Sequence, residues 1–286
     1  MGRALGRRLH ETGWKIVVVT STTQANARRA TNFIGGGRPA AGIPATLIGA
    51  STILLTVPDD CIAPVAADLA RQHGPELLGK IVLHTSGARD SSALEPLRAC
   101  GAATGSMHPL QTFNAVNVPP LVGRVFGIEG DELAVRMARR MARSLGGVPV
   151  GIAAQNKSLY HAAGAFAAGL SLALEEAGVQ VLMSAGLKRR EAQSALLSLT
   201  RQVLEHYEKL GPQKAWTGPL ARGDFGVVAE HAEALRRAQP EFLETYRAVS
   251  RLSALVLAGD PEVLLQKLDT IFAKEKPLAN AKGGRE

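Results

Sequence analysis

The sequence has few of the residues that hold small proteins together by covalent or metal cross-links. Its 286 residues include two cysteines, Cys61 and Cys100, which are far apart and belong to no C-x-x-C or Cys/His pattern. This spacing excludes a disulfide-rich scaffold and gives no support to a structural zinc site. We expect two buried, unpaired thiols and a fold held by apolar burial, for which a composition that is 46% hydrophobic is sufficient.

Aromatic residues are also scarce, at 4% of the chain, and the positive charge is not concentrated in one segment. The formal net charge of +8 comes from basic residues in short groups, such as Arg7-Arg8 and residues 188–190. Proteins that bind single-stranded nucleic acids usually combine a basic groove with aromatic stacking platforms, and no such pattern is present. Nucleic-acid binding is therefore a minor alternative, and we expect no nucleic-acid partner.

Apolar runs long enough to cross a membrane are missing from the sequence pattern. The longest extends from Ala162 to Leu174 and ends at Glu175-Glu176, short of the roughly 20 residues that a spanning helix needs. The arginines near the start are not followed by the apolar segment of a secretory signal. We expect a cytoplasmic protein with no membrane partner.

The first half of the chain alternates short apolar runs with amphipathic stretches. Near-continuous apolar strands separated by helical crossovers are typical of a mostly parallel, doubly wound sheet with helices on both faces. We therefore expect an α/β domain over residues 1–152. Its strands are predicted at residues 15–20, 52–57, 80–84, 102–107, 124–128 and 148–152, and its helices at residues 2–11, 23–33, 62–73, 92–100 and 131–145.

The second half loses the β-branched runs, and Ala, Leu, Glu, Gln and Arg recur at helical spacing. We expect an all-α domain over residues 153–279 and a disordered tail at residues 280–286. The predicted helices cover residues 153–185, 189–210, 225–237, 240–257 and 261–274. The first of them is the longest and carries an apolar face through Leu159, Ala163, Phe166, Leu170 and Leu174.

The chain begins with part of a dinucleotide-binding fingerprint. In the pattern G-x-G-x-x-G a strand precedes the glycines, and the third glycine opens a helix whose N-terminus binds the pyrophosphate. Here Gly2 occupies the third position and residues 3–11 form the helix, but the strand and both earlier glycines are absent. Taken alone, this is weak evidence for a cofactor, since many surface helices start in the same way.

The end of the following strand favours NADP over NAD. An acid at this position would bind the adenine ribose of NAD, and Ser21 and Thr22 stand there instead. Hydroxyl groups followed by Arg28 and Arg29 suit a ribose 2′-phosphate better, and a solvated helix face explains the two arginines about equally well.

The next strand ends at Val57-Pro58, where the nicotinamide side of a cofactor would lie, because ligands bind outside the carboxyl ends of strands in such sheets. Capping of the next helix is the favoured role of Asp59 or Asp60.

Three longer motifs resemble one known family. Residues 82–113 read VLHTSGARDSSALEPLRACGAATGSMHPLQTF, residues 157–170 read KSLYHAAGAFAAGL, and residues 215–235 read AWTGPLARGDFGVVAEHAEAL. Together they resemble the Rossmann-like proteins that carry a C-terminal helical domain of unknown function, of the DUF2520 type. This family is related to pyrroline-5-carboxylate reductase and to the 6-phosphogluconate and β-hydroxyacid dehydrogenases, and the resemblance covers nearly the whole chain.

The resemblance implies an NAD(P)-binding, oxidoreductase-like architecture with a helical domain of the 6-phosphogluconate dehydrogenase C-terminal type. It also implies a homodimer formed through the helical domain, and it implies no particular substrate. The chain departs from the family at its start, where the family has a strand and a complete fingerprint. That strand would be central in the sheet, so its absence would leave two rows of backbone groups unpaired. We therefore expect the coding sequence to extend upstream, with Met1 read from an internal valine codon, which the upstream DNA would test.

Hydride transfer needs a polar group that exchanges a proton with the substrate, and two strand ends supply candidates. His84, Thr85 and Ser86 end one strand, and His108 ends the next, followed shortly by Gln111. We predict that His108 is catalytic, that Ser86 contacts the cofactor and that Gln111 contacts the substrate. A histidine satisfied by loop backbone is an equal alternative for His108, and a structural role is favoured for His84.

The long helix places Lys157, Tyr160 and His161 nearly on one face. A Lys or His there resembles the placement of the acid in the β-hydroxyacid dehydrogenases, although their G-x-x-G-x-x-x-K-x-x-N pattern is not present around Lys157. We predict His161 as the general acid, Lys157 as a second catalytic candidate and Tyr160 as a substrate contact. Arg222 could bind an anionic substrate in a bidentate manner, and a structural pair with Asp224 is the competing explanation.

These features favour an NAD(P)-dependent oxidoreductase that acts on an unidentified small molecule, with NADP as the preferred cofactor and NAD as the second choice. The alternative is a non-catalytic dinucleotide- or metabolite-binding protein on the same fold. The sequence has no Ser-His-Asp order, G-x-S-x-G or Walker pattern that would support a hydrolase or a kinase.

Overall fold

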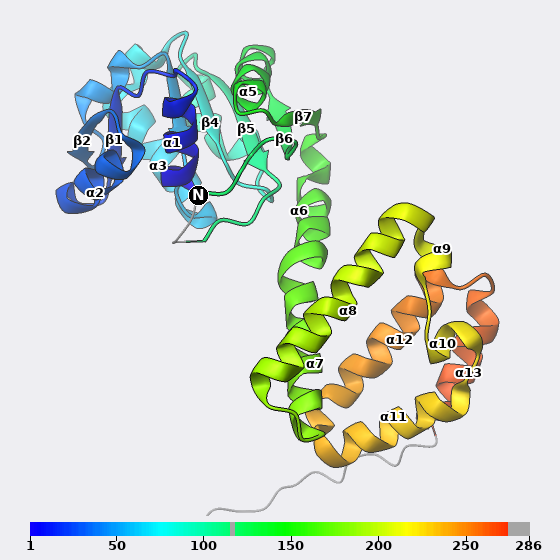
Figure 1. The fold of residues 1–286 in the computed structure, drawn as a ribbon. Coiled ribbons are helices and arrows are strands. Elements are labelled where there is room, and N and C mark those ends of the chain that lie inside the picture. Colours follow the sequence, from blue (N-terminus) through cyan, green and yellow to red (C-terminus); the bar gives the residue numbers. More distant parts are fainter. Residues whose placement is uncertain (115–117, 274–286) are drawn as a thin grey trace, which may run out of the picture. The chain divides into compact units, whose positions relative to one another are not determined.

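A computed structural model describes residues 1–114 and 118–273 (Figure 1). The chain divides into two compact units, Met1–Ala168 and residues 169–286. The boundary lies beyond the last strand, within a long helical segment, whereas the change in sequence pattern suggested residue 152. The predicted disordered tail at residues 280–286 lies outside the described residues.

The first unit contains a five-stranded sheet with the strand order β3-β4-β5-β6-β7. Neighbouring strands are parallel except for β5 and β6, which are antiparallel. The α/β fold class with a mostly parallel sheet is therefore confirmed. The five strands are β3 (Thr52–Leu55), β4 (Ile81–His84), β5 (Ala103–Pro109), β6 (Val125–Gly130) and β7 (Val148–Gly151).

Two further strands, β1 (Val18–Ser21) and β2 (Arg38–Ala41), form a separate parallel pair. Among the described residues, β1 makes no ladder with β3. The sheet is thus interrupted between the two strands that we expected to flank a missing central strand. The strand β2 was not predicted from the sequence, because its residues Arg-Pro-Ala-Ala carry no alternating or β-branched pattern.

The described part of the first unit has six α-helices, some of which cover the two faces of the five-stranded sheet. They are α1 (Gly2–Glu11), α2 (Gln24–Ile34), α3 (Asp59–His73), α4 (Glu95–Ala99), α5 (Glu132–Ser144) and α6 (Lys157–Ala165). Adjacent residues of β4 point to opposite faces: Val82 packs in a cluster with α3 residues such as Ile62, and Leu83 packs in a second cluster with α5 residues such as Ala138. This double burial explains the continuous apolar runs in the sequence.

The second unit is entirely helical in its described part. Its core gathers Val228, Ala232, Ala254, Leu264 and Leu268 from three helices. The helices are α7 (Ser171–Ser184), α8 (Arg189–Leu210), α9 (Pro212–Ala215), α10 (Pro219–Arg222), α11 (Phe225–Ala238), α12 (Leu243–Leu257) and α13 (Pro261–Ala273).

The helical segment Ala154–Ser184 is long and apolar enough to cross a membrane by length and composition, and about 6% of its most apolar window is buried. It includes a π-helical turn at Phe166–Leu170 between α6 and α7. A single helix of this kind is weak evidence for a membrane span. The segment is nevertheless longer than the run Ala162 to Leu174 on which we based our expectation.

The cysteines correct one expectation. Both are unpaired, as predicted, but Cys61 is exposed in the first half of α3 and Cys100 is half-buried, so neither is a core residue. The period of α3 turns Ile62 and Ala66 inward, and Cys61 therefore faces outward.

Candidate active site

The carboxyl ends of β3 and β4 and the N-terminus of α1 lie at one edge of the first unit. Gly2, the first residue of α1, packs against Thr56, which follows β3: a Cβ added at Gly2 would lie 2.2 Å from the Thr56 hydroxyl oxygen. A glycine is therefore required for the helix to approach the strand end, as expected of the third fingerprint glycine. The first turn of α1 contains no acid and no side-chain cap, so its amide dipoles are available to an anion.

Hydrogen bonds extend this edge from α3 to the loop after β4. The Ser86 hydroxyl donates to Asp59 Oδ2 at 2.7 Å, and it accepts from the backbone N–H groups of Ala88 and Arg89. His84 is fully buried, accepts from the Ser86 N–H through Nδ1, and directs Nε2 at the carbonyl of Asp90, 3.1 Å away. Burial lowers the pKa of His84, so His84 is a neutral, structural histidine that shapes this loop.

Lys157, the first residue of α6, is a buried side chain that contacts the loop after β4. Its side chain is 1% exposed. The Nζ atom donates to the Ser86 carbonyl and to the Ser106 hydroxyl, both at 2.8 Å. Burial lowers the pKa of Lys157 to about 8, against the Glu129, Asp90 and Asp59 carboxylates, which raise it. Lys157 therefore fastens α6 to the loop after β4 and to the middle of β5 from a position that solvent does not reach.

Two histidine rings meet at the backbone of Gly87. A Cβ at Gly87 would lie 2.5 Å from Nδ1 of His161 and 2.8 Å from Cε1 of His108. The two rings are edge to face, with centroids 5.6 Å apart, and the Tyr160 ring is at the same distance from His108. The structure thus brings together three of the side chains that the sequence singled out, and Gly87 leaves the space for them.

His108 and Tyr160 are neutral near pH 7. Burial, together with the neighbouring Lys157 and His161 side chains, lowers the pKa of His108 to about 4. Burial raises the pKa of Tyr160, whose hydroxyl lies 3.3 Å from both the Nδ1 atom and the carbonyl oxygen of His108. His161 differs from both because its side chain is exposed. Of this cluster, it is the group best placed to meet a ligand.

The predicted adenine-side residues follow β1. Ser21 is the last residue of β1 and is half-buried, while Thr22 is exposed in the turn before α2. Arg28 is exposed on α2, and Val57 and Pro58 lie between β3 and α3. All belong to the first unit; Ser21, Thr22, Val57 and Pro58 lie at or just beyond strand ends, whereas Arg28 lies within α2.

Gln111 and Arg222, two predicted substrate contacts, make no contact with the histidine cluster among the described residues. Gln111 donates to the Pro120 carbonyl at 3.2 Å and accepts from the Thr112 N–H. Arg222 belongs to the second unit, where its Nε atom donates to Asp224 at 2.9 Å. This pair with Asp224 is the structural role that the sequence offered for Arg222 as the alternative to substrate binding.

Sequence reasoning missed Ser106, which holds Lys157, and underrated Asp59, which holds Ser86. The signal for Ser106 was present: it stands two residues before His108 on a strand, so both side chains share one face. Asp59 was interpreted as a helix cap, but its carboxylate accepts from Ser86 instead.

Comparisons with known proteins agree with this architecture. A Rossmann-like domain model matches residues 1–109, and the model of the domain of unknown function DUF2520 matches residues 124–253. No curated protein matches the sequence.

Solved structures share the fold over nearly the whole chain. A protein of Thermotoga maritima is 23% identical with a TM-score of 0.67, covering 93% of this chain and 96% of its own. A reductive aminase of Aspergillus terreus, solved with NADPH and ethyl-5-oxohexanoate, is 20% identical with a TM-score of 0.59, covering 96% and 89%. A pyrroline-5-carboxylate reductase of Coxiella burnetii is 14% identical with a TM-score of 0.55, covering 96% and 93%. At such identities the likeness concerns the fold alone.

The two family models, the sheet topology and the helical second unit agree with the motifs around His84, Lys157 and Arg222. The chain therefore belongs to the proteins that join a Rossmann-like domain to the domain of unknown function DUF2520.

Proposed function

We propose that this protein is an NAD(P)-dependent oxidoreductase that reduces a C=O or C=N bond of a small molecule, with NADP as the preferred cofactor. The observation that carries the proposal is a continuous polar edge within the first unit, from Gly2 at the start of α1 to the His108, Tyr160 and His161 cluster. Ligands of open α/β sheets bind outside the carboxyl ends of the strands. The reductase and aminase named above share the fold and support the same chemistry.

The residues of this edge suit a dinucleotide phosphate. Gly2 and the open first turn of α1 would face the pyrophosphate, and Ser21, Thr22 and Arg28 would face the ribose 2′-phosphate. Val57, Pro58 and Ser86 would lie on the nicotinamide side. The bound cofactor supplies the hydride.

The protein's own part is to position the substrate and deliver a proton. We assign the proton donor role to His161, because it is exposed and its ring lies against the Gly87 backbone. Neutral His108 and the Tyr160 hydroxyl orient the substrate oxygen or nitrogen through hydrogen bonds. Lys157 holds the Ser86 loop and acts as a positioning residue. Direct substrate contacts by Gln111 and Arg222 stay predictions.

Cofactor binding is tested by titrating the protein with NADPH and NADH and following nicotinamide fluorescence. We expect saturable binding with NADPH preferred. Arg28→Ala should remove most of this preference, since a phosphate ion pair contributes about 1.5–3 kcal/mol. Arg71→Ala, at an exposed arginine paired with Asp68, is the matched control and should bind like the parent.

Turnover is tested by NADPH oxidation with panels of imines, keto acids and ketones. For a substrate that is found, His161→Ala should lower kcat by about 10²–10⁴-fold, while Ser158→Ala, exposed on the same helix, should not. Binding of NADPH without turnover, and with no effect of His108→Ala or His161→Ala on any activity, would point to the non-catalytic binding protein instead.

We further propose a homodimer formed through the helical domain, in the cytoplasm. Large apolar side chains are exposed on α7 and α8, among them Leu172 at 70% and Leu204 at 60%. Patches of this kind mark interfaces more often than free surface. Light scattering should give twice the monomer mass, and Leu172→Glu with Leu204→Glu should give a monomer, while Leu133→Glu on α5 should not. A monomer mass for the parent protein would contradict the dimer, and flotation of the parent protein with lipid vesicles would contradict the cytoplasmic location and support a membrane-bound helix.

A further inference from the structure

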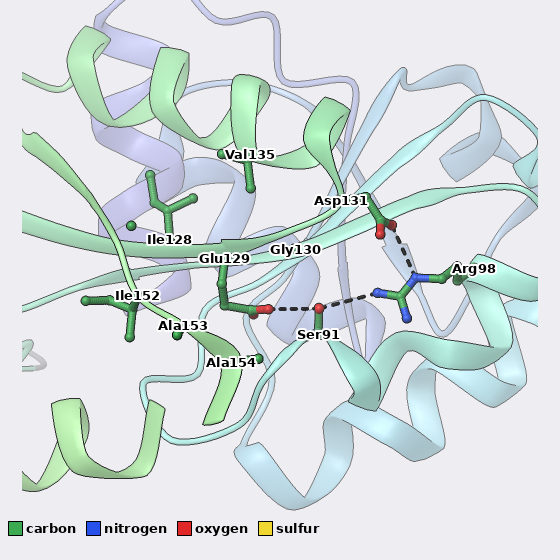
Figure 2. Close-up of a pocket in the computed structure, with 11 residues that line it drawn as sticks. Ser91, Arg98, Ile128, Glu129, Gly130, Asp131, Val135, Ile152, Ala153 and Ala154 are labelled. Carbon is green, nitrogen blue, oxygen red and sulfur yellow. Dashed lines mark hydrogen bonds and ion pairs between the residues drawn. The ribbon is translucent and has the colours of Figure 1, made fainter. Parts of the chain in front are cut away.

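Glu129, on β6, carries a buried carboxylate. The residue lines a pocket of about 780 Å³ (Figure 2), yet it is only 7% exposed. Its Oε2 atom accepts from the Ser91 hydroxyl at 2.8 Å, and its Oε1 atom is buried without a hydrogen-bond partner among the described residues. A buried acceptor that lacks a donor destabilises the fold, and more so when it is charged. The carboxylate therefore needs compensation from a positive charge inside the protein.

Lys157 has the complementary arrangement, a buried ammonium group with an unused donor. Its Nζ atom carries three N–H bonds, of which one is donated to the Ser86 carbonyl and one to the Ser106 hydroxyl, both at 2.8 Å. Among the described residues, no third hydrogen bond and no direct ion pair of Nζ is present. Burial favours the neutral form of a lysine, so a counter-charge is needed to keep this one charged.

Ser106 stands between these two charged groups. In the β5–β6 ladder it lies directly opposite Glu129, and opposite residues of an antiparallel pair point to the same face with Cβ atoms about 4.5–5.5 Å apart. On that face the Ser106 hydroxyl accepts from Lys157. One small side chain thus separates the carboxylate from the ammonium group, and none of the three residues is more than 7% exposed. Little water is available to screen the attraction.

Three carboxylates act on Lys157, and Glu129 is the buried one. Burial lowers the pKa of Lys157, and the carboxylates raise it, Glu129 more than Asp90 or Asp59. Asp59 is exposed at the start of α3, and Asp90, in the loop before α4, is half-buried. Because water screens exposed charges, Glu129 is the main counter-charge of the lysine.

Arg98, a cation that lines the same pocket, is engaged by other acids. Its Nε atom donates to Asp131 Oδ2 at 3.3 Å, and its Nη1 atom donates to Glu95. The rings of His84 and His108 add no positive charge near pH 7, because burial lowers the pKa of both. The lysine is therefore the cation that compensates the buried carboxylate.

We propose that Glu129 is a positioning residue of the candidate active site: its charge keeps the Lys157 ammonium group against the Ser86 carbonyl and so holds the loop after β4 in shape. In this role Glu129 touches neither cofactor nor substrate. The last step, from the Ser86 loop to the nicotinamide side of the cofactor, rests on the proposed function. The link between Glu129 and Lys157 concerns the protein alone.

The link is tested by following the titration of Lys157 by NMR in the full chain with ¹³C-labelled lysine, with Lys157→Met to assign the signal. Glu129→Gln retains an oxygen for Ser91 but removes the charge. It should lower the pKa of Lys157 from about 8 by a further 1–3 pH units, roughly the effect of losing a close opposite charge. Glu132→Gln, at an exposed acid of α5, should leave this pKa in place. The same pKa in Glu129→Gln and in the parent would overturn the proposal.

Glu129→Asp separates charge from size, because it shortens the side chain and keeps the charge. Lys157 should titrate closer to the parent in Glu129→Asp than in Glu129→Gln, and the reverse order would show a packing role and refute the proposal. Urea unfolding at pH 7 gives a second measurement that needs no assigned signal. Removing one partner of a buried charge pair costs more than removing both, so Glu129→Gln/Lys157→Met should be at least as stable as Glu129→Gln. Losses that simply add in the double variant would show two independent side chains and overturn the link.

The step to the cofactor is tested by NADPH binding at two pH values. At pH 7 the lysine is charged in the parent and largely neutral in Glu129→Gln, so the variant should bind NADPH severalfold more weakly. At pH 9.5 the lysine is neutral in both proteins, and the difference should disappear. An equal loss at both pH values would show that Glu129 acts by packing and would contradict its positioning role. A parent that binds no NADPH would refute the proposed function and this last step together, whereas the lysine titration decides the Glu129–Lys157 link by itself.

Discussion

The two units of this chain differ in the side chains that they bury: the buried polar side chains of the described residues, except Ser250, belong to the first unit, while exposed large apolar side chains are more frequent in the second. The first unit buries Lys157, His84, Thr104 and Ser106 and provides each with a hydrogen-bond partner. The second unit leaves apolar side chains such as Leu172, Leu204, Leu255 and Val256 exposed, over a smaller buried core.

The contrast indicates where chemistry and association belong. Burying a lysine or a histidine costs free energy unless hydrogen bonds compensate, so such groups persist where they hold a site in shape. Exposed leucine and valine on helices cost solubility, so they persist where another surface covers them. This contrast supports the two proposals made above, a site in the first unit and an interface on the second.

The largest expected effect tests whether the units are stable separately. The chain has one tryptophan packed in each unit, Trp14 against the first core and Trp216 against the helical core. Leu268→Ala deletes a fully buried side chain of the helical core and should lower its free energy of unfolding by about 2–5 kcal/mol.

Unfolding in urea is followed by tryptophan fluorescence in Trp14→Phe and Trp216→Phe proteins. In each of them the one remaining tryptophan reports the unfolding of its own unit. Leu268→Ala should shift the Trp216 transition and leave the Trp14 transition in place. Val263→Ala, at a 48% exposed position on the same helix, should shift neither. A common shift of both transitions would mean that the two units unfold together. Their stabilities could then not be compared separately.

The second prediction concerns the buried lysine of the first unit. Lys157 has a pKa of about 8 in the folded protein and about 10.4 in the unfolded chain. Between these values the unfolded state binds more protons, so stability should rise with pH. We expect a gain of about 2 kcal/mol from pH 8 to pH 9.5 in the Trp14 transition.

Lys157→Met should remove this rise, whereas Lys209→Met, at an exposed lysine of α8, should retain it. A rise that survives in Lys157→Met would assign the titration to another group and would weaken the description of the first unit as a set of buried polar contacts.

Much of the fold was predictable because the signals are local. The helices α1 and α8 were predicted to the residue, since each combines a helical apolar period with a clear end: α8 stops at Gly211, and α1 is followed by Thr12 and Gly13. The antiparallel direction of β6 was not predicted, because strand direction depends on distant partners and not on the strand's own residues.

The candidate site was predictable only in part. Strand ends and one helix face identified His108, Tyr160 and His161, which do lie together. The burial of Lys157 and the need for glycine at position 87 depend on distances between segments about 70 residues apart, and no local pattern contains them. The same holds for the unpartnered oxygen of Glu129, which a sequence shows only as one acid in an apolar strand.

A smaller effect is expected at the histidine cluster. The pKa of His108 is about 4 in the folded protein and about 6.5 in the unfolded chain. Since the unfolded state binds more protons in this interval, stability should fall as the pH drops from 6.5 to 4. With allowance for the partial exposure of the ring, we expect a loss of about 1–2 kcal/mol in the Trp14 transition.

His108→Gln should flatten this part of the profile, and the remaining slope reports the buried His84 and, towards pH 4, carboxyls such as Asp90 and Asp131, whose pKa values are lowered as well. His206→Gln, at an exposed histidine of the second unit, should have no effect on the Trp14 transition. If stability depends on pH in the same way in His108→Gln and in the parent, His108 is solvated in solution. That result would contradict the neutral, hydrogen-bonding role proposed for His108.

The smallest expected effect comes from the surface of the second unit, and it sharpens the contrast between the two. Arg189 donates through Nη2 to both carboxylate oxygens of Glu176, at 2.8 and 2.9 Å, and both side chains are substantially exposed. Exposed ion pairs contribute about 0.2–1 kcal/mol and are screened by salt. Arg189→Ala should therefore lower the Trp216 transition by less than about 1 kcal/mol, and the difference from the parent should shrink in high salt. Arg201→Ala, at an exposed arginine of the same helix, should be neutral. A larger, salt-independent loss in Arg189→Ala would show that this pair is covered in solution, as it would be beneath a second copy of the helical unit.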